Sequence, residues 1–146
     1  MVYREIEEKD VLEIAKLYMN SFNAQPWNDE WTVESASNRI LQMINCEGFY
    51  GLVCYDENDK LIGMILGNHE YYYNGMHFNI KEFCVDINIR GKGIGSEIIE
   101  EFTYRLKNRG INEIILFTSR TDGTEGFYNN RGFESFNSMV MMGKEI

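Results

Sequence analysis

The sequence predicts an α+β domain built on a mixed β-sheet. The chain has 146 residues, 44% hydrophobic and 25% charged, which is the size and composition of a folded domain. Apolar segments separated by short polar turns fill its middle, as in antiparallel hairpins. A glycine-rich turn, a helical segment and another apolar segment follow, as in a parallel crossover. With Pro26 as the single proline and no proline- or serine-rich linker, we expect one domain over residues 1–146.

The first part of the chain predicts a strand and two helices. Tyr3–Ile6 has the composition of a short strand. Asp10 suits a helix N-cap, and apolar residues recur after it at helical spacing. Polar and aromatic residues over 21–29 indicate a loop. Thr32 can cap a second helix, whose apolar face extends to Ile44.

Three strands in hairpin order follow. They are predicted over Phe49–Tyr55, Leu61–Tyr71 and Phe78–Asp86, with an Asn74-Gly75 turn before the last. The apolar residues of the last strand lose strict alternation near Glu82, which indicates a β-bulge.

The remaining elements follow the glycine-rich turn. We expect a helix from Ile94 to about Asn108, a buried strand over Ile111–Thr118 and a short helix over Thr124–Asn130. Residues Phe133–Met142 are predicted to form one or two further strands.

The net charge of −9 argues against duplex nucleic acid as a partner, because phosphates need a basic surface. Residues 1–59 hold twelve of the acidic residues and four of the basic ones, so nearly all of the excess lies there. A solvated acidic surface explains this distribution, and so does a cleft that attracts a cation. The sequence leaves both explanations open.

The three cysteines form no C-x-x-C pair and lie in apolar segments, so we expect reduced, buried thiols in a cytoplasmic protein. The N-terminus begins with charged residues, and no apolar run reaches the roughly 18 residues of a membrane span. We therefore expect neither a targeting segment nor a membrane anchor. His69 and His77, on either side of a turn, do not predict a metal site.

Residues 90–96 (Arg-Gly-Lys-Gly-Ile-Gly-Ser) lie between a strand and a helix, where unpaired helix N–H groups attract anions. A P-loop has its lysine after the last glycine, whereas Lys92 stands between two glycines. A dinucleotide fingerprint follows the first strand of a βαβ unit, whereas this loop follows hairpins. The loop therefore indicates an anion site of another kind.

Two motifs resemble those of the GCN5-related N-acetyltransferases, the GNAT superfamily. Arg90, Gly93 and Gly95 match its pyrophosphate loop, Gln/Arg-x-x-Gly-x-Gly/Ala, and residues 127–133 (Phe-Tyr-Asn-Asn-Arg-Gly-Phe) match its later motif. The resemblance covers essentially the whole chain, although Ile87 stands where many members have proline. It implies the GNAT fold, an α/β/α sandwich with a mixed, mostly antiparallel sheet, splayed central strands and about four helices.

The resemblance implies acetyl-CoA as co-substrate, bound where the strands Phe78–Asp86 and Ile111–Thr118 splay apart, and no metal. The pantetheine arm would pair with the backbone like an added strand, and the pyrophosphate would lie on loop amides. Thr121 stands where many members have an asparagine that contacts the cofactor. The residues implied for cofactor binding are Phe83, Val85, Arg90, Gly91, Lys92, Gly93, Ile94, Gly95, Ser96, Thr121 and Phe127.

The resemblance also implies catalytic roles. Tyr128 would protonate the departing thiolate, unless it is only a core aromatic. Glu82 would accept the amine proton through water, unless it is an exposed carboxylate paired with Lys81 or with an arginine across the sheet. A backbone N–H near Val85, freed by the bulge, would stabilise the oxyanion. Cys84 would suit a covalent route, but a buried thiol and direct attack by the amine fit the family better.

The acceptor site in this fold is implied for the loop between the first two helices and for the hairpin tips. Aromatic faces and carboxylates gather there in the sequence, a combination that binds cationic amines. The same tryptophans could instead cap helix ends, and the tyrosine run could be an ordinary hairpin tip. The candidate acceptor residues are Trp27, Asp29, Trp31, Glu70 and Tyr72.

The resulting functional hypothesis is an acetyl-CoA-dependent N-acetyltransferase for a small cationic amine such as an aminoglycoside or polyamine. The pattern is most similar to the aminoglycoside N-acetyltransferase-like branch. The alternatives are a protein or peptide N-acetyltransferase and a CoA-binding module without catalysis. The resemblance also allows a homodimer.

Overall fold

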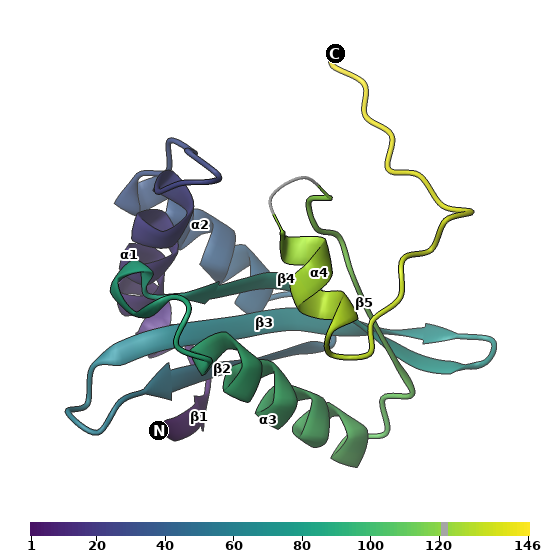
Figure 1. The fold of residues 1–146 in the computed structure, drawn as a ribbon, viewed down its shortest axis with the longest axis horizontal. Coiled ribbons are helices and arrows are strands. Elements are labelled where there is room, and N and C mark those ends of the chain that lie inside the picture. Colours follow the sequence, from purple (N-terminus) through teal and green to yellow (C-terminus); the bar gives the residue numbers. More distant parts are fainter. Residues whose placement is uncertain (121–122) are drawn as a thin grey trace. The chain divides into compact units, whose positions relative to one another are not determined.

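The computed structural model describes residues 1–120 and 123–146. The chain forms two compact units, Met1–Leu116 (unit 1) and Phe117–Ile146 (unit 2), and each is described by itself. Unit 1 contains a five-stranded mixed sheet with helices on both faces, which confirms the α+β class (Figure 1). A single domain over residues 1–146 stays a prediction.

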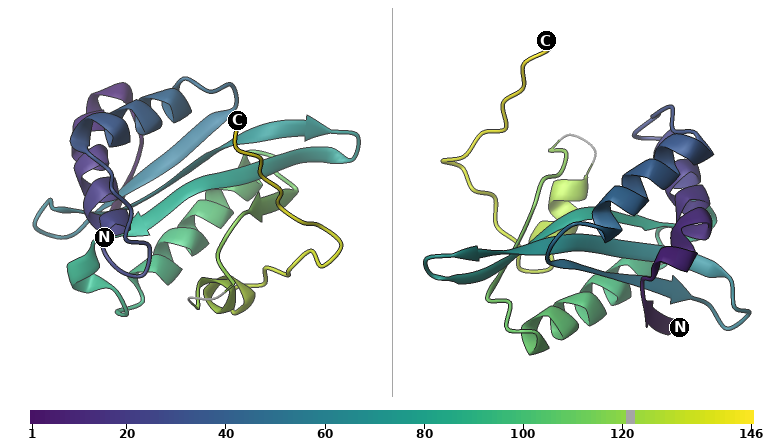
Figure 2. Two further views of the ribbon diagram at one scale, coloured as in Figure 1. Left: turned by 90° about the horizontal axis from the view of Figure 1, so that it is seen from above. Right: turned by 180° about the vertical axis from the view of Figure 1, so that it is seen from behind.

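The sheet of unit 1 has the strand order β1-β2-β3-β4-β5. The pairs from β1 to β4 are antiparallel, and β5 lies parallel to β4. The long β3–β4 hairpin extends past the neighbouring strands (Figure 2). The strands are β1 (Val2–Glu5), β2 (Phe49–Tyr55), β3 (Leu61–Tyr72), β4 (Gly75–Val85) and β5 (Glu113–Leu116).

The three long helices lie in unit 1. α1 (Val11–Asn23) and α2 (Val33–Ile44) cover one face of the sheet, and α3 (Ile94–Asn108) covers the other (Figures 1 and 2). The 3₁₀ helices η1 (Glu8–Asp10) and η2 (Ile87–Ile89) precede α1 and the glycine loop. α1 continues to Asn23, past the start of the predicted loop, because its last turn still packs against the protein interior.

Both predicted helix caps occupy the N-cap position, but they bond differently. The Thr32 hydroxyl accepts from the Ser35 amide at 3.1 Å, and the Ser35 hydroxyl accepts from the Thr32 amide at 2.9 Å. The Asp10 carboxylate makes no cap bond to α1. It accepts from the Glu7 amide at 2.8 Å and from both terminal nitrogens of Arg4 at 2.8 and 2.9 Å, so it ties β1 to η1.

The predicted β-bulge is present one residue before its expected place. Leu66 on β3 pairs with Glu82 and Gly67 pairs with Ile80, so Lys81 is the extra residue of β4. Phe78 contacts Phe102 of α3, whereas Cys84 belongs to the core cluster beneath α1 and α2. The bulge therefore reverses the faces to which β4 presents its even-numbered residues.

The described residues of unit 2 contain one helix, α4 (Thr124–Asn129), which agrees with the predicted short helix to within one residue. The prediction of strands over Phe133–Met142 is wrong, because this segment forms no strand among the described residues. A strand needs a neighbour that satisfies its backbone, and an apolar sequence pattern does not supply one. Large apolar side chains consequently remain exposed at Phe136, Met139, Val140, Met141 and Met142.

Candidate active site

Glu82 is a carboxylate that β4 presents to the two helices of one sheet face. Its side chain is 12% exposed. One oxygen, Oε1, accepts from Nε and Nη2 of Arg39 on α2, at 3.0 and 2.9 Å. The hydroxyl of Tyr18 on α1 donates a further hydrogen bond to Glu82. Glu82 is therefore neither exposed nor paired across the sheet, because its partners come from the helices above it.

The bulge explains why Glu82 points toward these helices. With regular alternation, Glu82 would share the α3 face with Phe78. The extra residue Lys81 turns Glu82 to the face of Cys84 instead. A local irregularity of the strand thus places the candidate base.

Opposing influences act on the ionisation of Glu82. Burial raises the pKa of its carboxyl above the ordinary value, and the nearby Asp29 carboxylate adds to this rise. The hydrogen bonds and charge of Arg39, and the hydrogen bond from Tyr18, lower the pKa without cancelling the rise. Glu82 is therefore a stronger base than an exposed glutamate.

Sequence reasoning missed both partners of Glu82. Tyr18 resembled an ordinary member of the apolar face of the first helix. Arg39 held the clearer signal, since it stands three residues after Ala36 and four before Met43, two buried members of the apolar face of α2. A basic residue within such a face indicates a buried acidic partner.

The edge of β4 that faces β5 is open beyond Ile80. The β4–β5 pairing ends at Ile80 and Leu116, so within unit 1 no strand lies beside this edge from Lys81 to Val85. The Asp86 amide donates to the Ile62 carbonyl at 2.9 Å. Ladder alternation then directs the Val85 amide away from β3, toward the open edge. The Val85 amide faces the open edge because of the ladder alternation and the early end of β5. The predicted cause, the bulge, is not responsible.

The glycine loop has the backbone geometry of an anion site. Gly91 and Gly93 adopt φ angles of 80° and 84°, and a Cβ at either position would meet nothing within 4 Å. The Ser96 amide donates to the Gly93 carbonyl at 3.0 Å, so the helix already uses it. Among the described residues, hydrogen-bond partners are absent for the amides of Gly91, Lys92, Gly93, Ile94 and Gly95.

The side chain of Arg90 bonds to α1 and the loop after it. Its Nη2 donates to the Ser21 carbonyl at 2.8 Å, and its Nη1 donates to the Gln25 carbonyl at 2.9 Å. A cation at the C-terminal end of a helix is favourable for the helix dipole. Arg90 therefore connects the glycine loop to the candidate acceptor loop.

The acceptor loop after α1 is held near Glu82 through Trp31. The Asn23 side chain bonds the Trp31 amide and carbonyl, each at 2.8 Å, and the indole N–H donates to Asp29 at 3.0 Å. The Trp31 ring meets the Tyr18 ring edge-on at 5.0 Å. Trp27 packs near Phe22 with ring centres 5.9 Å apart. Both tryptophans thus cover the end of α1, and each remains partly exposed.

Glu70 and Tyr72 lie far along β3 from the other candidates in unit 1. The Tyr72 hydroxyl donates to Glu70 at 3.4 Å, and its ring stacks on His77 at 4.3 Å. At about 3.4 Å per residue, Tyr72 lies about 20 Å along the strand from Leu66, the partner of Glu82. The structure does not gather these two residues with Glu82.

The remaining candidates lie in or near unit 2. Tyr128 on α4 contacts the rings of Phe127 and Phe133 at 5.1 and 5.4 Å, and burial raises the pKa of its hydroxyl to about 12. The Arg131 guanidinium lies 3.7 Å from the centre of the Phe127 ring. Thr121 lies outside the described residues.

The Cys84 thiol is buried beneath α1. Burial raises its pKa to about 12, and a hydrogen bond with Ser21 only partly opposes this rise. The thiolate form needed for nucleophilic attack is therefore disfavoured.

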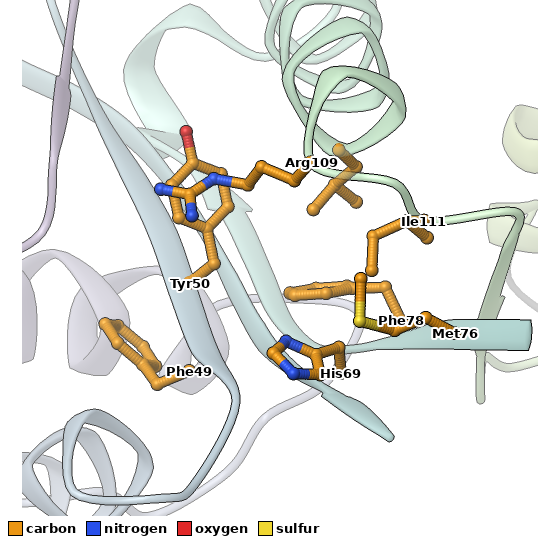
Figure 3. A pocket seen from close by; sticks show the side chains of 8 residues that line it. Phe49, Tyr50, His69, Met76, Phe78, Arg109 and Ile111 are labelled. Carbon is orange, nitrogen blue, oxygen red and sulfur yellow. The ribbon is translucent and has the colours of Figure 1, made fainter. Parts of the chain in front are cut away.

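A separate cavity of about 100 Å³ lies on the α3 side of the sheet (Figure 3). The Arg109 guanidinium lies over the Tyr50 ring, 3.7 Å from its centre, and also bonds Glu5 at 3.0 Å. Phe49, His69, Met76, Phe78, Leu106 and Ile111 form the rest of the lining. It faces away from Glu82, so it is not part of the candidate site.

Candidate metal clusters and membrane-spanning helices are both absent from the described residues. Over residues 1–120 and 123–146, side chains of His, Cys, Asp and Glu do not gather in threes that could hold a metal ion. In the same part of the chain, every helix is too short or too polar to span a bilayer.

Comparisons with known proteins agree with this geometry. The sequence model of the acetyltransferase (GNAT) family matches residues 11–133. No curated protein sequence matches the chain.

Solved structures share the fold at low sequence identity. A possible acetyltransferase from Clostridium difficile 630 has a TM-score of 0.83 at 19% identity, with 99% of this chain and 97% of that chain covered. An aminoglycoside acetyltransferase from an uncultured soil metagenomic sample, in complex with sisomicin, has a TM-score of 0.76 at 20% identity, with coverage of 99% and 95%. A transcriptional regulator from Bacillus halodurans C-125 has a TM-score of 0.77 at 19% identity, with coverage of 98% and 99%.

Proposed function

Because this chain belongs to the GNAT acetyltransferase family, we propose that it transfers the acetyl group of acetyl-CoA to the primary amine of a small cationic acceptor. One observation carries this proposal. The buried carboxylate of Glu82 lies on the stretch of β4 whose edge β5 leaves open, in the unit that also holds the glycine loop. A proton acceptor and a binding edge therefore occur on the same strand.

The residues of unit 1 fit CoA in two places. The amides from Gly91 to Gly95 would hold the pyrophosphate, because left-handed glycines leave the backbone open to a phosphate. The open edge at Phe83 and Val85 would pair with the amide groups of the pantetheine arm. When bound, acetyl-CoA supplies the activated acetyl thioester.

Glu82 would act as general base toward the acceptor. An aliphatic ammonium has a pKa near ~10, so it must lose a proton before its nitrogen can attack. Glu82 would accept this proton through a water molecule, and its raised pKa strengthens it for that task.

Two further groups would act on the thioester. The Val85 amide, directed to the open edge, would donate to the carbonyl oxygen as that oxygen gains charge. Tyr128, assigned by family resemblance, would donate a proton to the leaving thiolate. Its raised pKa keeps the hydroxyl protonated at neutral pH, as an acid must be.

The acceptor class rests on the loop beside Tyr18. The Asp29 carboxylate is close enough to act on the ionisation of Glu82, and Trp31 offers an aromatic surface next to it. A carboxylate and an indole suit a cationic amine such as an aminoglycoside or a polyamine. Trp27 would extend this surface. Glu70 and Tyr72 lie too far along β3 for us to include them.

An acceptor screen tests the proposal. Release of the CoA thiol would be followed with aminoglycosides, polyamines and lysine-containing peptides. We expect turnover with the cationic small molecules. Turnover with peptides alone would instead support a protein or peptide acetyltransferase, and acetyl-CoA binding without turnover on any amine would support a CoA-binding module.

Glu82→Gln tests the base. The wild-type protein should lose kcat/KM at low pH as Glu82 is protonated. The variant should show a low rate without this acidic limb. A limb retained in the variant would assign the base to another group.

A further inference from the structure

The Arg39–Glu82 ion pair joins α2 to the bulged part of β4 beneath α1 and α2. Both donors of Arg39 converge on one oxygen of Glu82, so the guanidinium leaves Oε2 unused. Two charge-assisted bonds from one guanidinium hold this oxygen in place more firmly than a single bond would. The pair thus orients the carboxylate through Oε1, and Arg39 makes no bond to Oε2.

We propose that Arg39 is a positioning residue of the acetyl transfer, which orients the Glu82 carboxylate through Oε1 and holds it as an ionised base for the acceptor's proton. This inference rests on the proposed function, since it assigns Arg39 a role through Glu82.

The charged and titratable groups around Glu82 single out Arg39 for this role. Tyr18 donates from α1 but stays neutral, because burial and the Glu82 charge raise its pKa. Asp29 on the acceptor loop opposes ionisation of Glu82, as does burial. On β4 itself, Cys84 is a neutral buried thiol. Arg39 is thus the cation that favours the ionised form of Glu82.

Lys81, also on β4, does not supply a positive charge to Glu82. With the Asn79 amide oriented to satisfy its surroundings, the Asn79 oxygen accepts from the Lys81 ammonium at 3.0 Å. On β3, Leu66 stands opposite Glu82 and contributes no charge. Replacing Arg39 would therefore remove the hydrogen-bonded counter-charge of the Glu82 carboxylate.

The sign of the effect follows from these contacts. Loss of an opposite charge in direct contact raises the pKa of a carboxyl by about 1 to 3 units. Arg39→Met should therefore move the acidic limb of the kcat/KM profile to higher pH by about one unit or more. Arg39→Lys keeps the charge but not the fork, so the limb should stay near its wild-type position while kcat falls.

A titration of Glu82 that does not depend on turnover accompanies the kinetics. The chain would be labelled with ¹³C at glutamate carboxyls, and the Glu82 signal would be assigned by its loss in Glu82→Gln. In Arg39→Met, this signal should titrate at higher pH, by the same amount as the kinetic limb. Should Arg39→Met fail to fold, Arg39→Gln gives the same test, because it also removes the charge.

The control is a second arginine–carboxylate pair with a buried carboxylate, between Arg4 and Asp10. Arg4→Met should lower thermal stability and leave the Glu82 titration and the acidic limb unchanged. An Arg39→Met protein that loses stability with an unshifted Glu82 titration would overturn the inference and make Arg39 purely structural.

Failure of the proposed function gives a different pattern. If no amine is acetylated, or if Glu82→Gln keeps the limb, the base assignment falls, and the proposed role of Arg39 falls with it. In that case the ¹³C titration still reports whether Arg39 sets the ionisation of Glu82. A shifted titration would then leave the electrostatic link standing without a catalytic role.

Discussion

Tyr128 is the single residue whose side-chain chemistry the proposed reaction needs at the leaving group. We expect Tyr128→Phe to lower kcat at least about tenfold, because general acid catalysis contributes factors of about 10² to 10⁴. The affinity for CoA, measured calorimetrically, should stay nearly unchanged because the ring is retained. Tyr104→Phe, at a tyrosine that is 63% exposed on α3, is the matched control. An unchanged rate would remove Tyr128 from the mechanism.

Asp10 shows how one carboxylate stabilises an otherwise exposed N-terminal strand. Burial opposes its ionisation, but the hydrogen bonds from Arg4 and the Glu7 amide outweigh burial and hold its pKa below the usual range. The stabilisation is therefore present above the unfolded-state pKa of about 3.9, and it is lost as the pH falls through the folded-state pKa.

Asp10→Asn should accordingly cost about 2 kcal/mol of unfolding free energy at pH 7, since it weakens charge-assisted bonds. The difference from wild type should shrink as the pH falls below about 4, as measured by urea unfolding. Glu5→Gln, at an exposed ion pair with Arg109, should change the stability at pH 7 by less than about 1 kcal/mol. A wild-type advantage that persists unchanged at low pH would contradict this account.

At the scale of the element, the bulged β4 depends on a glycine of its neighbour. A Cβ at Gly67 of β3 would lie 1.9 Å from the Asn79 carbonyl oxygen and 2.9 Å from the Phe78 ring. The two backbones can approach at the bulge only because this position has no side chain. Gly67 therefore supports the strand geometry that aims Glu82.

Gly67→Ala should destabilise unit 1 by about 3 kcal/mol, because relief of the clash requires a backbone shift. Chemical denaturation measures this change. Gly126→Ala, at a helical position where a Cβ meets nothing within 4 Å, is the control and should be neutral or stabilising. A Gly67→Ala protein with wild-type stability would show that β3 can move away from β4.

Strand β4 also explains why only part of the site could be predicted from the sequence. Lost alternation near Glu82 predicted a bulge, and the structure contains one at Lys81. Lost alternation does not say which residue is extra, however, and that residue decides the face to which Glu82 points. The glycine loop was easier to predict, because left-handed glycines before a helix are a local requirement.

At the scale of the whole molecule, part of the acidic excess of residues 1–59 is used in contacts that stabilise the fold. Several of these acids bond groups away from Glu82: Glu5 pairs with Arg109, Glu7 with Lys9, Asp10 with Arg4, and Glu13 with Tyr55. Asp29, by contrast, acts on Glu82. A cationic acceptor is therefore supported by Asp29 on the acceptor loop rather than by the net charge of residues 1–59.

Asp29→Asn tests whether this carboxylate binds the cationic acceptor. It should raise KM for a cationic amine about three- to tenfold, because a charge-assisted contact is worth roughly 1 kcal/mol at an exposed site. Steady-state kinetics with the best amine of the screen measure the change. Asp59→Asn, in the exposed turn between β2 and β3, removes the same net charge and should leave KM unchanged. Equal effects of the two variants would show that only the overall charge matters.

By itself, the sequence determined the features whose signals are local. The Thr32 cap, the span of β2 and the start of α3 after Gly93 were predicted because capping, periodicity and left-handed turns are decided within a few residues. The predicted strands at Phe133–Met142 failed because a strand also needs a partner, which a local pattern cannot name.

Only the tertiary structure decided what surrounds Glu82. Arg39 is 43 positions away in the chain, and the two meet only when α2 packs over the bulged strand. Tyr18 joins them from α1, where its spacing resembled that of any core aromatic. Burial and long-range pairing set the chemistry of a carboxylate, and both arise from packing rather than from neighbours in sequence.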